Sequence, residues 1–176
     1  RHMLATIVRL SESNEDAGHK VAMQVAAMKP IALDEASVPQ SVKDEELKVA
    51  IEKTKEEQVE KAVVNAIKKA GVNPNLVDSE DHIESNIKKG WLTPEDAEKA
   101  REIRAKVGAE KAANLPEQMV QNIAKGRLNK FFKESCLVDQ EFQFGDGDKL
   151  NVAQWLQAQS KTLAVCDYRR YSLSAE

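Results

Sequence analysis

The residues that could carry chemistry are few and scattered in this sequence. It contains three histidines, His2, His19 and His82, and two cysteines, Cys136 and Cys166. No histidine has a helical i, i+4 partner of the kind that binds zinc, and the cysteine spacing fits neither a metal site nor a redox pair. We therefore expect two free thiols, no metal site and no catalytic residue.

Two acidic motifs are similar to functional sites but fit structural roles better. The Gly-Asp-Gly-Asp run at 145–148 opens like a calcium loop, but Leu150 occupies the third ligand position and no glutamate follows at the required spacing. Adjacent carboxylates such as Glu56 and Glu57 lie in a charge-dense segment, which favours a solvated face over an acid–base pair. No glycine-rich loop ends in Lys-Ser or Lys-Thr, so we expect neither a phosphate-binding loop nor a cofactor.

The composition is that of a charge-rich chain without a membrane segment. The 176 residues are 41% hydrophobic and 31% charged, with a net charge of −3. No apolar run approaches the roughly 20 residues that span a bilayer, and there is no signal peptide. These features predict a cytoplasmic protein, and the negative charge argues against nucleic acid as the main partner. Residues 1–3 are expected to be a cloning remnant, so that the natural chain would be longer.

The elements that must position these residues begin with a strand and a helix. Residues 4–10 form a β-branched apolar run, which predicts a strand buried on much of both faces. A helix should follow, capped by Ser13 and ended by Pro30. Its apolar stripe contains Ala17, Val21, Val25 and Met28.

Residues 43–113 predict a helical hairpin. The segment holds 14 Lys and Arg, 16 Asp and Glu and a single aromatic residue, Trp91. It can bury little apolar area, but two long helices can pack along an alanine-rich seam. One helix should end at Gly71, a short helix should cover roughly 79–89 and end at Gly90, and another helix should begin with Thr93 and Pro94. Residues 72–92 would then lie near the tip. A compact three-helix bundle is the alternative.

The last third of the chain supplies most of the aromatic residues. A helix should begin after Pro116 and continue through Phe131 and Phe132, with a bend or a close approach at Gly126. An extended piece, a short helix bearing Trp155 and a final strand should follow. Together the elements predict an α+β fold: a small antiparallel sheet packed by helices in 4–42 and 114–176, with a projecting antiparallel helical (coiled-coil) hairpin inserted at 43–113.

Two surfaces remain as candidates for binding a partner. In the extended piece, Phe142 and Phe144 should point to one side and Gln143 to the other, because strand side chains alternate. Both rings could pack in the core, or Phe144 could be presented to a partner as an anchor. The first helix also has a second, uncharged face that either packs in the core or binds a partner. This face carries His19, Ala22 and Met23.

Two stretches resemble the core of bacterial elongation factor Ts. HKVAMQVAAMKPIALDEASVP is similar to the family's helix with Ala-Met-x-x-Ala-Ala, followed by a proline, a connector and Val-Pro. AKGRLNKFFKESCLVDQEFQF is similar to the family's G-R-x-x-K-F…L…Q-x-F stretch, although Lys125 and Glu141 stand where the family often has Glu and Pro. The strands LATIVRL and KTLAVCDYRRYSL flank them in the family's order. The resemblance covers about 4–42 and 116–173, and the hairpin takes the place of the family's coiled coil, enlarged.

The resemblance implies a parent protein that exchanges guanine nucleotide on elongation factor Tu without being an enzyme. The family's N-terminal module and its Thr-Asp-Phe motif, which loosens magnesium and phosphate contacts, are missing from this chain. The chain is therefore expected to supply docking surface, with elongation factor Tu, GDP-bound or nucleotide-free, as its partner. The segment after Q-x-F packs on the third domain of elongation factor Tu in the family, which maps here to Gln143 and Phe144. His19, Ala22 and Met23 are further candidates for contact with the partner. They rest only on the uncharged second face of the first helix and not on the resemblance.

Two other functions remain open. A structural module could self-associate through the hairpin, giving a homodimer. An RNA-binding module could use the basic stretch at 125–133, which combines four cations with two rings. These residues are Lys125, Arg127, Lys130, Phe131, Phe132 and Lys133.

Overall fold

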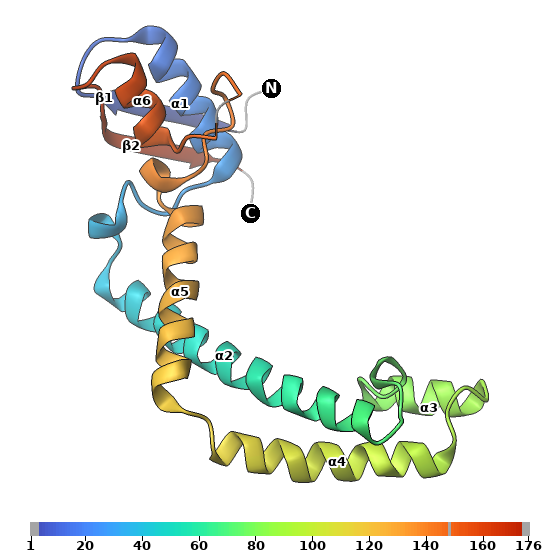
Figure 1. Ribbon diagram of the computed structural model, residues 1–176. Coiled ribbons are helices and arrows are strands. Elements are labelled where there is room, and N and C mark those ends of the chain that lie inside the picture. The colour runs from blue at the N-terminus through green and yellow to red at the C-terminus, as the bar shows by residue number, and fades with distance from the viewer. Residues whose placement is uncertain (1–3, 148, 174–176) are drawn as a thin grey trace. The chain divides into compact units, whose positions relative to one another are not determined.

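The computed structural model describes residues 4–147 and 149–173 (Figure 1). The elements run in the order β1 (Leu4–Leu10), α1 (Glu15–Met28), α2 (Gln40–Lys69), α3 (Glu80–Lys88), α4 (Pro94–Ala113), α5 (Glu117–Ser135), α6 (Val152–Gln159) and β2 (Val165–Ser172). Three short 3-10 turns join them, at Glu35–Ser37, Pro74–Leu76 and Leu137–Asp139. This arrangement confirms the expected α+β fold. The expected cloning remnant at 1–3 lies outside the described residues.

The chain divides into two compact units. One, here called the core unit, consists of residues 1–46 and 126–176, and the other, here called the helical unit, consists of residues 47–125. Each unit has its own cluster of buried apolar side chains.

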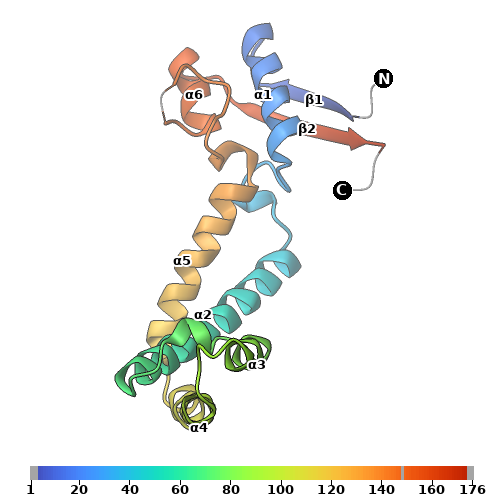
Figure 2. The ribbon, with the colours of Figure 1, turned by 90° about the vertical axis from the view of Figure 1, so that its right-hand side faces the viewer.

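The sheet of the core unit pairs the first strand with the last. β1 and β2 are antiparallel, with Val8 opposite Tyr168 and Ile7 opposite Arg169. Val8 and Tyr168 pack against the cluster that contains residues of α1, whereas Ile7 is 60% exposed. Figure 2 shows α1 lying beside the two strands. The expectation of a strand buried on both faces was therefore wrong, because this antiparallel pair has a helix on only one face.

The core unit buries most of its rings in two clusters. The larger cluster joins α1, the 3-10 turn after α5, α6 and β2. Its buried members are Ala17, Val21, Val25, Leu137, Phe142, Val152, Trp155, Leu156, Leu163 and Val165. The smaller cluster contains Ala32, Val38, Phe132 and Cys136, with Phe131 packed against it. The aromatic residues near the end of the sequence thus build the body of the core unit.

Helix α1 ends before Pro30 as expected, but its cap and the burial of its last residue differ from the prediction. Its cap is Asn14, whose side-chain oxygen accepts the Ala17 N–H at 3.0 Å, rather than Ser13. At the other end Met28 is 42% exposed and does not extend the apolar stripe, because the helix ends there and Lys29 adopts a left-handed conformation with φ 46°. The buried face includes a polar residue instead, Gln24, which is 0% exposed.

In the helical unit, α4 runs antiparallel to α2, and α3 packs with them (Figures 1 and 2). The three helices share one cluster, whose buried members are Val63, Ile67, Val72, Val77, Ile83, Leu92, Ala97 and Ala100. Asn86 of α3 donates from its side-chain amide to the Leu76 carbonyl at 2.9 Å, and Arg104 of α4 pairs with Glu60 of α2 at 2.6 Å. The short helix expected at roughly 79–89 is therefore present as α3, and it packs in the same apolar cluster as α2 and α4, which is closer to the three-helix alternative than to a simple hairpin.

Local signals placed most boundaries of the helical unit correctly. Gly71 and Gly90 have φ of 83° and 76°, and the Thr93 hydroxyl accepts the Asp96 N–H at 3.1 Å, with Pro94 as the first helical residue. The expectation at Gly126 was wrong, because α5 is one helix from Glu117 to Ser135 and no other segment within the described residues approaches this glycine closely. A Cβ at Gly126 would meet no atom within 4 Å, so this glycine marks an open position on the helix.

Candidate docking surface

Residues 140–144, here called the docking loop, follow the 3-10 turn after α5. The first part is extended, because Phe142 N donates to Leu150 O at 2.9 Å and Val152 N donates to Gln140 O at 3.1 Å. Gln143 and Phe144 then enter a turn. The expectation of one extended segment is thus corrected at its end, where the backbone turns away from residues 150–152.

The two rings of the docking loop lie against each other. The centroids of Phe142 and Phe144 are 6.3 Å apart in an edge-to-face arrangement, and Phe142 also lies 4.7 Å from the ring of Trp155. Phe142 is 5% exposed, whereas Phe144 is half-buried against the larger cluster. Phe144 therefore contributes to the core and still presents part of its ring to solvent.

Gly145 allows this packing. A Cβ at this position would lie 3.1 Å from Trp155 Cδ1 and 3.3 Å from Phe142 Cδ2, closer than nearly all real Cβ contacts. A side chain at this position would therefore force one of the two rings to shift by a few tenths of an ångström.

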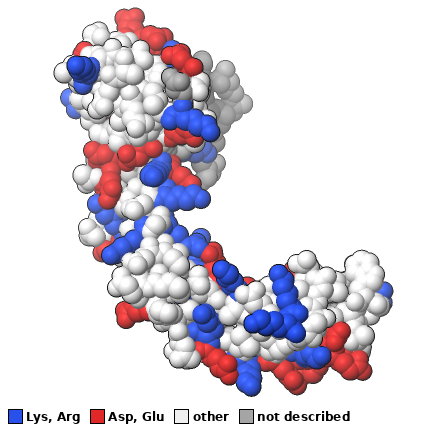
Figure 3. Space-filling view, in the orientation of Figure 1, with Lys and Arg blue, Asp and Glu red and all other residues white. Residues whose placement is uncertain are grey.

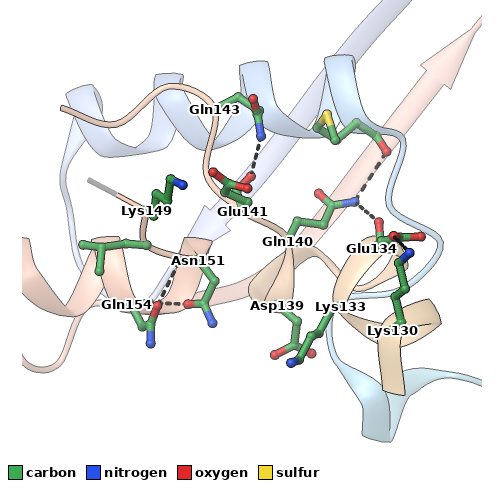
Figure 4. Close-up of a pocket in the computed structure, with 12 residues that line it drawn as sticks. Lys130, Lys133, Glu134, Asp139, Gln140, Glu141, Gln143, Lys149, Asn151 and Gln154 are labelled. Carbon is green, nitrogen blue, oxygen red and sulfur yellow. Dashed lines mark hydrogen bonds and ion pairs between the residues drawn. The ribbon is translucent and has the colours of Figure 1, made fainter. Parts of the chain in front are cut away.

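Two buried glutamines hold the docking loop. The Gln24 amide donates to Gln140 Oε1 at 3.2 Å and to the Glu141 carbonyl at 3.1 Å, and Gln24 Oε1 accepts the Gln143 N–H at 3.0 Å. The Gln140 amide in turn donates to the Glu134 carbonyl at 3.0 Å and the Met28 carbonyl at 3.4 Å (Figure 4). Their exposed fractions are 0% and 1%.

Sequence reasoning gave these glutamines no role. In the sequence, Gln140 is part of the Q-x-F motif, and Gln24 is a single polar residue within the apolar run 21–28. Gln24 lies three residues after Val21 and directly before Val25, which places it on the apolar face of the helix. This position indicates a buried hydrogen-bonding role, because a polar side chain on a buried face needs a partner.

The candidates on α1 differ in exposure. His19 is exposed, and Ala22 and Met23 are half-buried. The Ala22 carbonyl accepts a hydrogen bond from the Thr6 hydroxyl at 3.0 Å, which joins this part of α1 to β1. Gln143 is exposed, and its side chain donates to the Glu141 carbonyl at 3.1 Å (Figure 4).

A hollow of about 520 Å³ lies beside the docking loop. Its walls carry charges of both signs, from Lys130, Lys133, Glu134, Asp139, Glu141 and Lys149 (Figure 4). Burial, followed by the nearby carboxylates Glu35 and Asp34, raises the pKa of Asp139 above its usual range. Such a mixed polar wall suits the rim of a protein interface.

The described residues hold little that could perform bond chemistry. Among residues 4–147 and 149–173, no group of three or more His, Cys, Asp or Glu side chains is placed to hold a metal ion. Gly147 has φ 90°, as a turn requires, whereas Asp148 of the same motif lies outside the described residues. The cysteines are free, as expected. Within the same ranges, every helix is too short or too polar to cross a membrane.

Charges on the helical unit are mixed as well. On the face drawn in Figure 3, lysine and arginine alternate with aspartate and glutamate over this unit. Several are paired: Arg101 bonds Glu80, and His82 bonds Asp78, which lowers the pKa of that aspartate. This face therefore shows no single-sign patch of the kind that binds nucleic acid.

Comparison with known proteins identifies relatives over almost the whole chain. A family model described as elongation factor Ts matches residues 1–78 and 59–175. Elongation factor Ts of Parabacteroides distasonis is 55% identical over 176 residues, covering 100% of this chain and 53% of the relative. Elongation factor Ts of Phocaeicola vulgatus is 57% identical over 175 residues, which cover 99% of this chain and 53% of the relative. Elongation factor Ts of Porphyromonas gingivalis is 28% identical over 174 residues, which cover 98% of this chain and 42% of the relative. The chain thus spans about half the length of its first two relatives.

Proposed function

The chain belongs to the elongation factor Ts family, and on that premise we propose that it is the docking part of a guanine-nucleotide exchange factor for elongation factor Tu. The observation that carries the proposal is the family match across both units. The protein would act in the cytoplasm, where translation takes place, and would catalyse no bond change of its own.

The physics of exchange separates docking from nucleotide release. An exchange factor binds its nucleotide-free partner more tightly than the nucleotide-bound form, and the coupling is reciprocal. A surface that binds both forms equally contributes affinity but shifts no equilibrium. This chain offers a loop held by hydrogen bonds with Gln24, and its sequence contains no Thr-Asp-Phe motif. We therefore assign it affinity for elongation factor Tu and little power to release GDP.

The proposed contacts are centred on the docking loop. Gln143 is exposed and Phe144 is half-exposed, and both are held by a loop whose other residues are buried or bonded. A preorganised loop loses little conformational entropy on binding, which favours affinity. His19, Ala22 and Met23 on α1 are proposed as additional contacts, of which His19 is the most accessible.

Calorimetric titration of this chain with elongation factor Tu·GDP tests the proposal. We expect saturable binding, and we expect Phe144→Ala or Gln143→Ala to weaken it about tenfold, or about 1.4 kcal/mol. Gln157→Ala, at an exposed position of α6, is the matched control and should bind like the unmodified chain. No binding at high micromolar concentration would end the docking assignment.

A stopped-flow assay of GDP release tests the other half of the proposal. At saturating concentrations of this chain, GDP should leave elongation factor Tu at nearly its spontaneous rate, because the element that opens the nucleotide site is missing. Release as fast as with a full-length exchange factor would show that the docking surface itself discriminates between the two states.

One observation favours self-association as a second candidate function. Trp91, in the turn between α3 and α4, is 64% exposed, and Lys89 Nζ lies 4.8 Å from its ring centroid. Light scattering should then show a dimer that Trp91→Ala converts to a monomer. The RNA alternative gains no such support, since Phe132 is 5% exposed and packs edge-to-face with Phe131 rather than standing open for stacking.

A further inference from the structure

The buried amide of Gln24 lies at the point where the docking loop meets α1. We infer that Gln24 is a positioning residue, which acts with Gln140 to set the conformation in which Gln143 and Phe144 face a partner. The inference concerns a residue of the core rather than of the surface, and its consequence for binding rests on the proposed function.

The orientation of the Gln24 amide follows from its backbone partners. The Gln143 N–H can only donate, so the atom 3.0 Å from it must be the Gln24 oxygen. The Glu141 carbonyl can only accept, so the atom 3.1 Å from it must be the Gln24 nitrogen. One side chain thus satisfies a donor and an acceptor of the loop backbone, two residues apart.

Gln140 extends this bonding to both neighbouring helices. Its oxygen accepts from Gln24 at 3.2 Å, and its nitrogen donates to the Glu134 carbonyl in α5 and the Met28 carbonyl at the end of α1. The amide pair therefore ties the loop to two helix ends. Because both side chains are almost fully buried, water cannot replace these bonds unless the loop opens.

The loop and the core depend on Gln24 to different degrees. The larger cluster is held by apolar contacts among residues such as Val21, Val25 and Leu156, none of which needs an amide. Without the Gln24 amide, the Gln143 N–H and the buried side-chain oxygen of Gln140 would lose their partner, and the Glu141 carbonyl would keep only its bond from the Gln143 side chain. The loop would then shift until the unpaired groups reach water or a new partner. We expect the fold to persist while Gln143 and Phe144 change position.

Trp155 reports the position of the loop directly. Its ring lies 4.7 Å from that of Phe142, and it is 4% exposed. The chain has only one other tryptophan, Trp91, which is exposed in the helical unit. In a Trp91→Phe background, the emission spectrum therefore belongs to Trp155 alone.

The test compares Gln24→Met with Gln157→Met in this background. Methionine keeps the length of the side chain but removes both hydrogen-bonding atoms. We expect Gln24→Met to keep the native circular dichroism, to shift Trp155 emission and to weaken binding of elongation factor Tu·GDP about tenfold. Gln157→Met should change none of these. An unchanged Trp155 spectrum in Gln24→Met would overturn the inference, whether or not the unmodified chain binds elongation factor Tu.

Two further variants separate positioning from a general loss of stability. If Gln24 acts through Gln143, adding Gln143→Ala to Gln24→Met should cost no further affinity, whereas independent effects would add and would contradict the inference. In Gln24→Glu, the ionised carboxylate cannot donate to the Glu141 carbonyl, but the protonated acid can. Trp155 emission should therefore return to its original position as the pH falls, and Gln157→Glu should show no such pH dependence. Emission in Gln24→Glu that is the same at every pH would also count against positioning.

Discussion

The two cysteines lie in opposite environments. Cys136 is 0% exposed in the smaller cluster of the core unit, and Cys166 is exposed on β2. Burial, reinforced by the carboxylates of Asp139, Asp34 and Glu35, raises the pKa of Cys136 to about 11. Only the thiolate reacts, so this thiol is inert at neutral pH. Because its pKa is higher in the folded state, its protonated form favours folding, and that contribution is lost as the pH rises toward 11.

Alkylation of the folded chain should therefore distinguish the two thiols. At pH 8 iodoacetamide should modify Cys166 and leave Cys136 intact, and in denaturant it should modify both. Peptide mass spectrometry measures the two sites separately, and the denatured sample serves as the control. Equal rates at both sites in the folded chain would contradict the burial of Cys136.

At the scale of the elements, Gly108 of α4 lies against two valines of α2. A Cβ there would lie 3.7 Å from Val63 Cγ2 and 3.8 Å from Val59 Cγ1, which are ordinary contact distances. The seam therefore has room for one methyl group and no more. A larger side chain would have to displace two valines of α2.

Substitutions at Gly108 should accordingly have opposite signs. Gly108→Ala should raise the free energy of unfolding by up to about 1 kcal/mol, because alanine favours a helix over glycine. Gly108→Leu should lower it by about 1–3 kcal/mol through overpacking. Urea unfolding measures both changes. Ala105→Gly, at an exposed position of the same helix, is the control for helix propensity. A destabilised Gly108→Ala would show that the seam has no space for a methyl group.

At the scale of the whole molecule, stability is distributed over two units. Ile67 in the helical unit and Leu156 in the core unit are both 0% exposed, and each belongs to the buried cluster of its own unit. Cavities in separate clusters should act locally, because the packing of one cluster does not include residues of the other.

Hydrogen exchange should reveal this division. Ile67→Ala and Leu156→Ala should each cost about 2–5 kcal/mol in the cluster that loses the side chain. We expect Ile67→Ala to accelerate amide exchange mainly in residues 47–125, and Leu156→Ala to do so mainly in the core unit. The two variants are controls for each other. Acceleration across the entire chain in both would mean that the units unfold together.

The sequence by itself determined the features that depend on neighbours along the chain. Thr93, Pro94, Gly71 and Gly90 marked helix ends, since capping and left-handed backbone are local properties. A β-branched apolar run predicted β1, and the residue types of the last third predicted α6 and β2, and hence the α+β fold. The ordered motifs likewise carried the family membership that the comparisons confirm. The site residues Gln143, Phe144, His19, Ala22 and Met23 stay predictions until binding is measured.

Only the tertiary structure decided which residues support the docking loop. Gln24 and Gln140 are separated by 116 positions, so no local pattern could show that their amides meet in a buried site. Equally, the turn at Gln143, the open face of the sheet and the packing of α3 onto its neighbours depend on what lies across space. Hydrogen bonds and burial between distant segments exist only once the chain has folded, and they decide which side chains remain available to a partner.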